Sequence, residues 1–110
     1  VNSDHSLTFY CAVENGIVLT AMRPGSLQDN LHQLFAGLHE RLGDTLLTIG
    51  CDCFLRRLEA EGRGEQEQVA AILRQYGVTG FNTYGEQFNG MHINQTFTGV
   101  AIGQRTFSRT

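Results

Sequence analysis

The sequence contains no lysine and no tryptophan, has a single proline, and only 17% of its 110 residues are charged. All eight basic residues are arginines, and eleven acidic residues outnumber them, which gives a formal net charge of −3. Because nucleic-acid binding needs clustered positive charge, this balance argues against a nucleic-acid partner. The absence of lysine also excludes Schiff-base chemistry and phosphate-binding loops that depend on a lysine.

Long hydrophobic runs are also absent. Runs of consecutive apolar residues, such as Ile17–Leu19, fall far short of the roughly 20 residues that cross a bilayer, so no membrane partner is expected. The cysteines, Cys11, Cys51 and Cys53, are odd in number and do not form a disulfide framework. With no export signal, reduced thiols and a cytoplasmic location are expected. The chain opens on Val1 without an initiator methionine, which favours a processed chain or a piece of a longer protein.

The first third of the chain carries two strand patterns and one helix pattern. Apolar residues alternate over Leu7–Val13 and predict a strand with one buried face. The Asn15–Gly16 pair tolerates the positive φ angles of a type I′ turn, so it predicts a hairpin with a second strand over Ile17–Met22. Ser26 then predicts the N-terminal cap of a helix that ends at Gly43, because apolar residues recur at helical spacing between them: Leu27, Leu31, Leu34, Phe35, Leu38 and Leu42.

The rest of the chain alternates between strand patterns and helix patterns. They predict a strand over Thr45–Ile49, a helix from Asp52, a helix carrying Val69 to Tyr76, and strands over Val78–Tyr84 and Thr96–Ile102. A polar segment over 85–95 separates the last two strands and is expected to be a loop. The predicted fold is one α+β domain with the order ββα-β-α(α)-ββ. It consists of an antiparallel or mixed sheet of about five strands with helices packed on one face.

One candidate site lies at the predicted junction of a strand and a helix, in the Gly50–Cys53 segment. If Asp52 caps the helix, Cys53 lies in its first turn, where exposed amides and the guanidinium of Arg56 would lower the pKa of the thiol. The alternative is that the cysteines are small hydrophobic residues at this junction. Arg56 and its neighbour Arg57 are expected to hold anionic ligand groups or to form a structural ion pair.

A second candidate site lies in the 85–96 segment. Polar side chains are dense there: Glu86, Gln87, Asn89, His92, Asn94 and Gln95. A histidine in such a loop can ligate a metal, carry protons or hold the loop together. Glu86 is also the expected partner if Arg56 or Arg57 forms a structural ion pair.

Three blocks in these two regions resemble the C-terminal part of the FIST sensory module. The blocks are Gly50-Cys-Asp-Cys-Phe-Leu-Arg-Arg-Leu-Glu59, Gly80-Phe-Asn-Thr-Tyr-Gly-Glu-Gln87 and Met91-His-Ile-Asn-Gln-Thr-Phe-Thr-Gly-Val100. Their order and spacing fit the family, and the likeness covers nearly the whole chain. Within the family, the chain is most similar to the bacterial nitric-oxide-sensing proteins (NosP). The resemblance implies that residues 1–110 are a FIST C-like sensory domain and not an enzyme.

The resemblance also implies a cofactor and partners. The similar branch consists of haem-binding sensors that regulate a histidine kinase or a cyclic-di-GMP enzyme, with an N-terminal FIST domain in the same chain. His92 is then the expected axial ligand, Cys53 comes second, and His32 and His39 are further candidates. The full set of candidate ligand or haem-binding residues is His92, Cys53, Arg56, Arg57, Tyr84, Glu86 and Asn94. Other FIST proteins are described as sensors of small ligands such as amino acids, which makes a small-molecule sensor the alternative.

The same residues allow three other interpretations. A cysteine hydrolase would use Cys53 as nucleophile, His92 as base and Asn94 or Glu86 to orient the base. A zinc site would use Cys51, Cys53 and His92. An interaction module would dock a partner domain or a second copy, as a homodimer, through an exposed sheet face or edge.

Overall fold

The structure is a computed structural model that describes residues 1–104. Within these residues, three helices and five strands follow in the order α1 (Leu27–Leu42), β1 (Thr45–Cys53), α2 (Phe54–Arg63), α3 (Gln66–Gln75), β2 (Val78–Thr83), β3 (Glu86–Phe88), β4 (Met91–Ile93) and β5 (Phe97–Gly103). Among the described residues, no helix is both long enough and apolar enough to cross a membrane.

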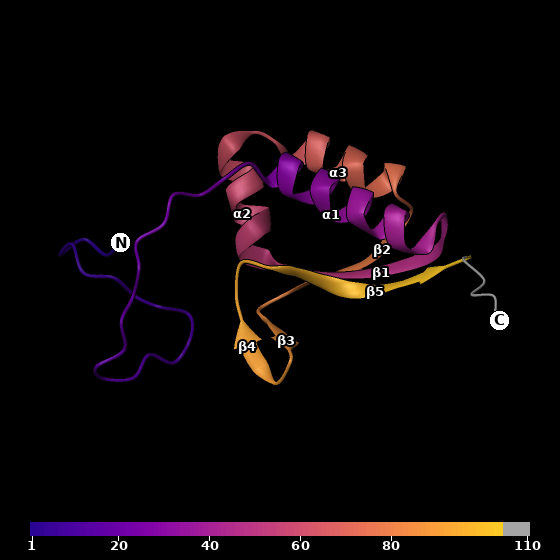
Figure 1. Cartoon of the computed structure of the whole chain (residues 1–110). Helices are drawn as coiled ribbons and strands as arrows, with labels where there is room; N and C mark the ends of the chain where they lie inside the picture. The colour runs from indigo at the N-terminus through magenta and orange to yellow at the C-terminus, as the bar shows by residue number, and fades with distance from the viewer. Residues whose placement is uncertain (105–110) are drawn as a thin grey trace.

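A three-stranded sheet carries the helices on one face. Its strand order is β2-β1-β5, with β1 parallel to β2 and antiparallel to β5. All three helices lie on the same side of this sheet (Figure 1). Strands β3 and β4 form a separate antiparallel hairpin below it. The predicted α+β class, with a mixed sheet and helices on one face, is therefore confirmed.

The predicted N-terminal strand pair is the main error. The turn forms, because the amide of Ile17 donates to the carbonyl of Glu14 at 3.4 Å and Gly16 has a φ of 82°. However, neither Leu7–Val13 nor Ile17–Met22 is a strand, and residues 1–26 are exposed. An isolated hairpin is at best marginally stable in water, and no neighbouring strand pairs with this segment among the described residues.

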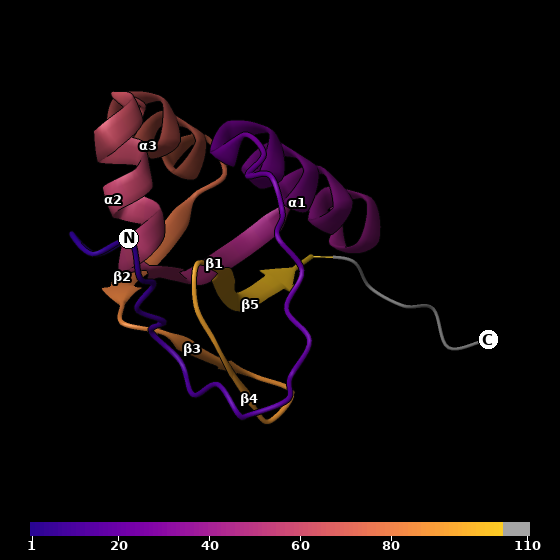
Figure 2. The ribbon, with the colours of Figure 1, turned by 90° about the vertical axis from the view of Figure 1, so that its left-hand side faces the viewer.

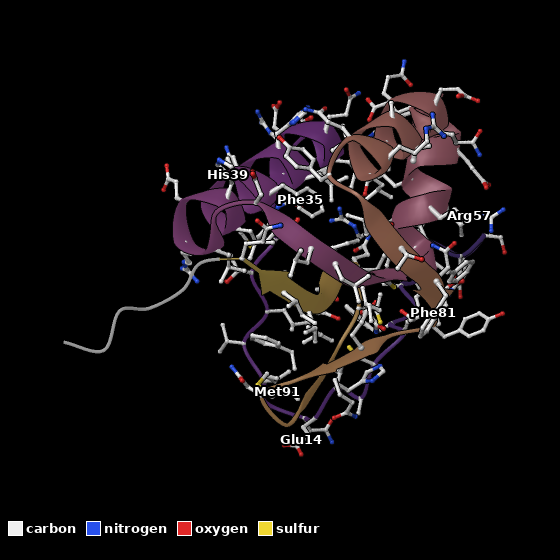
Figure 3. All side chains as sticks on the ribbon, turned by 90° about the vertical axis from the view of Figure 1, so that its right-hand side faces the viewer. Glu14, Phe35, His39, Arg57, Phe81 and Met91 are labelled. Carbon is white, nitrogen blue, oxygen red and sulfur yellow. The ribbon has the colours of Figure 1, made fainter. Side chains whose placement is uncertain are left out.

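Helix α1 forms as its sequence predicts. The hydroxyl of Ser26 accepts from the amide of Asp29 at 3.2 Å, which caps the helix, and Gly43 ends it with a φ of 69°. Its apolar stripe provides Leu31 and Phe35, which are buried with Ile72 of α3 in the core. Figure 3 shows Phe35 between α1 and the sheet.

Three glycines lie side by side across the sheet. Gly50 of β1 pairs with Gly80 of β2 on one side and with Gly99 of β5 on the other. The ring of Phe97 lies over the central glycine of this row, since a Cβ built on Gly50 would lie 2.5 Å from Cζ of that ring. Phe97 in turn meets Phe35 edge to face, with ring centroids 6.0 Å apart. The glycine row thus allows an aromatic ring to pack directly onto the backbone of the sheet.

The predicted loop over 85–95 contains the β3–β4 hairpin. Asn89 and Gly90 form its two-residue turn, with φ angles of 50° and 76°. Positive φ at both central positions is typical of a type I′ turn, which matches the twist of the flanking strands. The hairpin begins at Glu86 and therefore holds the polar residues of this segment in fixed positions.

The sheet face opposite the helices is apolar and uncovered. The exposed side chains there are Leu47, Ile49, Phe81, Val100 and Ile102, each between 40% and 66% exposed. Residues 1–22 do not cover this face, because they run to one side of the domain, beside the β3–β4 hairpin (Figure 1). The radius of gyration is 16.8 Å, compared with about 13 Å for a compact domain of this length.

Candidate functional site

The carboxyl ends of the two parallel strands lie together at one edge of the sheet. Asp52 pairs with Asn82 and Cys53 with Thr83 at the ends of β1 and β2. Helix α2 begins immediately afterwards at Phe54 and rises from this edge (Figure 2). In sheets with parallel strands, ligands commonly bind in the crevice outside these carboxyl ends.

A buried ion pair occupies this edge. The Nε of Arg56 donates to Oδ1 of Asp52 at 2.8 Å, and its Nη1 donates to Oδ1 of Asn30 at 3.2 Å. Only 9% of the Arg56 side chain and 16% of the Asp52 side chain are exposed. The amide of Asn82 donates to the backbone carbonyl of Asp52 at 3.4 Å. Arg56 therefore joins α1, β1 and α2.

This ion pair lines a cavity of about 230 Å³ between α2, α3 and the strand ends. Its polar groups come from Asp52, Arg56, Arg57, Gln66 and Asn82. Its remaining wall is apolar and consists of Leu27, Ala60, Val69, Ala70 and Leu73. A mostly apolar cavity with a few convergent polar groups is the usual form of a small-molecule site.

Burial raises the pKa of Asp52 above its ordinary value. Desolvation is the largest cause, the positive charge of Arg56 opposes it, and the negative charge of Glu86 adds to the increase. The ionised form of such a carboxyl group is stabilised by any further positive charge that a ligand brings into the cavity.

The raised pKa of Asp52 predicts a specific dependence of stability on pH. The folded state holds the proton of Asp52 more tightly than the unfolded chain does. This contribution to stability is therefore complete below the ordinary value near 3.8 and is lost as pH rises through the raised value. Asp52→Asn removes the titration and keeps an oxygen for Arg56. We expect the unfolding free energy of the wild type to fall relative to that of the variant as pH rises through this window. Urea denaturation between about pH 3 and pH 7 measures the difference, and a flat or opposite trend would contradict the assignment.

Arg57 and Tyr84 lie outside this buried group. Arg57 points away from the domain on α2 (Figure 3) and donates from Nε to Glu61 at 3.0 Å, with 62% of its side chain exposed. Tyr84 is 88% exposed and rests against the ring of Phe54, with centroids 5.4 Å apart. Only Arg57 reaches the rim of the cavity.

Glu86 is a structural clamp. It is 5% exposed, and its two carboxylate oxygens accept from the hydroxyls of Thr83 at 2.5 Å and Thr96 at 2.6 Å. These bonds join the end of β2 and the segment before β5 to the hairpin. The predicted ion pair between Glu86 and an arginine is therefore wrong, because Arg56 pairs with Asp52 and Arg57 with Glu61.

His92 and Asn94 lie together on the hairpin. A Cβ built on Gly85 would lie 2.5 Å from Cε1 of His92 and 2.7 Å from Oδ1 of Asn94, so both side chains close over this glycine. The amide of Asn94 also donates to the backbone carbonyl of Tyr10 at 3.0 Å. His92 is exposed and lines none of the five cavities described for this chain.

Cys53 does not lie where the sequence predicted. Strand β1 continues through it, so Cys53 rather than Asp52 is the N-cap residue of α2, and it makes no side-chain cap bond. It is completely buried, which supports its interpretation as a small core residue and disfavours a cysteine nucleophile. Within residues 1–104, no three His, Cys, Asp or Glu side chains are placed to hold a metal ion, so Cys51 and Cys53 form no zinc site with His92.

The two histidines of α1, His32 and His39, contact neighbouring side chains of the domain. His32 lies edge to face with Tyr76, with ring centroids 6.2 Å apart. His39 lies 3.6 Å from the carboxylate of Asp44, and both side chains are exposed. Neither residue lines the cavity that contains Asp52.

Comparison with known proteins identifies one family. The sequence profile described as the FIST C domain matches residues 1–89. This range contains every residue that lines the Asp52–Arg56 cavity and ends before His92 and Asn94. No curated protein and no solved structure gives a significant match. Since the profile covers most of the chain, the chain belongs to the FIST C domain family, a family of sensory domains associated with signal transduction.

Proposed function

We propose that this domain senses a small zwitterionic ligand of the amino-acid class, bound in the cavity lined by Asp52 and Arg56. The observation that carries the proposal is the presence of a carboxylate and a guanidinium in one small, otherwise apolar cavity. The proposal specifies the ligand-sensing role that the FIST C family supports.

The polar groups of the cavity complement both charges of such a ligand. A ligand ammonium group would pair with the largely buried carboxylate of Asp52, because desolvation raises the pKa of this group more than the charge of Arg56 lowers it. A ligand carboxylate would accept from the guanidinium groups of Arg56 and Arg57, since both arginines line the cavity. The Asn82 and Gln66 amides supply further donors and acceptors.

The size of the cavity restricts the ligand. Its volume of about 230 Å³ lies below the roughly 300–1,000 Å³ of sites for drug-sized ligands. Val69 and Leu73 of α3, with Leu27 of α1, provide an apolar wall for a ligand side chain. The geometry therefore favours a single amino acid with an apolar side chain over a peptide or a nucleotide.

A matched pair of substitutions on α3 tests the proposal. Ala70 lines the cavity, whereas its neighbour Ala71 is exposed and does not. Ala70→Leu fills the cavity and is expected to weaken binding of the best amino acid by about tenfold or more. Ala71→Leu is expected to leave the affinity unchanged. Isothermal titration calorimetry with a panel of free amino acids measures both. If no amino acid binds, or if the two variants behave alike, the proposal is wrong.

The haem-binding nitric oxide sensor is the competing proposal, and it makes a different spectroscopic prediction. Phe88 and Met91 flank His92 on the hairpin, and all three residues are exposed. We therefore expect haem mixed with this chain to show no Soret shift that depends on His92. A Soret shift that is lost in His92→Ala would favour the haem sensor. Regulation of a histidine kinase or a cyclic-di-GMP enzyme and an N-terminal FIST domain in the same protein are proposals that rest on the family resemblance. A cytoplasmic location is a proposal that rests on the sequence expectation of reduced thiols.

A further inference from the structure

We propose that the free edge of β5 binds residues 17–22 of a second copy of this chain, so that two copies exchange strands and form a symmetric dimer. The proposal is independent of the ligand cavity. It rests on an unpaired strand edge, an apolar groove beside that edge and an unpaired segment whose sequence is typical of a strand.

The acceptor is the outer edge of β5. Within the described residues, β5 pairs with β1 on one side and with no strand on the other. The amide of Cys53 donates to the carbonyl of Thr96, and bonding alternates along antiparallel strands. The backbone groups of Phe97, Gly99 and Ala101 therefore point to the open edge. An unpaired edge of this kind is a template for another strand.

An apolar groove of about 410 Å³ runs beside this edge. Leu34 and Leu38 of α1 form one wall, and Phe88 and Ile93 of the hairpin contribute to the other side. Thr48 also lines the groove, and its buried hydroxyl has no hydrogen-bond partner. A strand added to β5 would place alternate apolar side chains into this groove.

The donor is the Ile17–Met22 segment. Its six residues are rich in the β-branched and aliphatic types that favour strands, and its length is close to the seven residues of β5. Its large side chains are exposed, from 55% for Ile17 to 89% for Val18. Exposed apolar residues in this pattern indicate a segment that forms a strand only when it has a partner.

The connection to α1 directs this segment away from its own β5. Only three residues, Arg23, Pro24 and Gly25, separate Met22 from the cap of α1, and proline restricts both its own φ and the preceding residue. The carbonyl of Gly25 also accepts from Arg63 at the end of α2, at 3.4 Å. Figure 1 shows the segment leaving the body past α2, away from the length of β5. Short hinges of this kind favour exchange between chains over folding back.

The exposed area is large enough for a dimer. The chain exposes 8709 Å², whereas a compact monomer of its mass exposes about 6,000 Å². The excess exceeds the roughly 800 Å² that each partner buries in a standard interface. Because each copy supplies one donor and one acceptor, a single two-fold axis satisfies both edges.

Sedimentation equilibrium of the full chain, with three variants, tests the exchange. The wild type is expected to be a dimer. Leu19→Pro breaks the donor strand, and because Leu19 is exposed and outside every helix and strand, the domain itself should still fold. It is expected to raise the dissociation constant by about tenfold or more. Leu19→Val keeps the strand propensity and is the matched control, expected to remain a dimer. Ala101→Pro removes an outward amide from the acceptor edge and should weaken the dimer as Leu19→Pro does.

Each outcome decides the proposal. A dimer that both proline variants weaken, and that Leu19→Val preserves, supports it. A monomeric wild type overturns it, including the case in which the segment pairs with its own β5. A dimer that Leu19→Pro leaves intact also overturns it and points to the uncovered sheet face. If Ala101→Pro fails to fold by circular dichroism, amide hydrogen exchange at Gly99 replaces it: protection in the wild-type dimer that is lost in Leu19→Pro supports the exchange, and equal exchange in both refutes it.

Discussion

Gly80→Ala is expected to destabilise the domain by about 3 kcal/mol or more, a large fraction of the stability of a domain this small. A Cβ on Gly80 would overlap the backbone carbonyl of Gly50 in the neighbouring strand, and Gly80 has a φ of 151°, which L side chains rarely adopt. Since both obstacles lie in the backbone, no side-chain rotation relieves them. Urea denaturation followed by circular dichroism measures the loss.

Gly62→Ala is the matched control for Gly80→Ala. Gly62 lies inside α2, and a Cβ built there meets nothing within 4 Å. The same change is therefore expected to stabilise the domain by about 0.5–1 kcal/mol, because alanine costs less conformational entropy in a helix. If Gly80→Ala unfolds within about 1 kcal/mol of the wild type, the close approach of β1 and β2 at this row is wrong.

The second large effect is expected from Arg56. Arg56→Ala leaves the carboxylate of Asp52 buried without its partner and also removes the donor to Asn30. Breaking a buried ion pair from one side costs about 3–5 kcal/mol. The adjacent Arg57 makes the same type of pair with Glu61 at the surface, so Arg57→Ala should cost no more than about 1 kcal/mol.

The two arginine variants separate the effect of losing a buried ion pair from the effect of losing an exposed one. They remove the same side chain from consecutive positions of one helix, and thermal or urea unfolding reports the difference directly. Equal losses in the two variants would show that the Asp52–Arg56 pair is not buried as described. Double replacement of Asp52 and Arg56 by Asn and Met should recover part of the loss, because no uncompensated charge remains.

Local signals predicted the helices well and the strands only where a partner strand was available. The Ser26 cap and the spacing of Leu27, Leu31 and Phe35 specify α1 without help from the rest of the fold. The Leu7–Val13 pattern is equally regular, but a strand is stabilised by its neighbours and this segment has none among the described residues.

The two Asn–Gly pairs show that the surrounding structure determines whether such a pair forms a hairpin. Asn15–Gly16 predicted a hairpin and gives only a turn, with a positive φ at Gly16 alone. Asn89–Gly90 forms a type I′ hairpin with positive φ at both residues, although the polar sequence around it predicts a loop. Glu86 explains the difference, since its bonds to Thr83 and Thr96 hold the second hairpin against the domain.

The candidate site was predicted in part. Arg56 was recognised, but its partner was not, even though Asp52 precedes it by four residues, a spacing that places oppositely charged side chains together. Asn30, Gln66 and Asn82 were missed, because only the packing of α1, α3 and β2 brings them to the cavity. The density of polar side chains around His92 predicts a site there, yet the fold places His92 on an exposed hairpin away from the cavity.

Mapping ligand binding on the folded chain by NMR tests directly whether an amino acid binds in the cavity lined by Asp52 and Arg56. Amide and side-chain signals of the isotopically labelled protein are followed while an apolar amino acid is added. We expect the largest shifts at the residues that surround one cavity: Asp52, Arg56, Val69 and Asn82. Saturable shifts centred on His92 and the hairpin, or no saturable shifts with any amino acid, would contradict it.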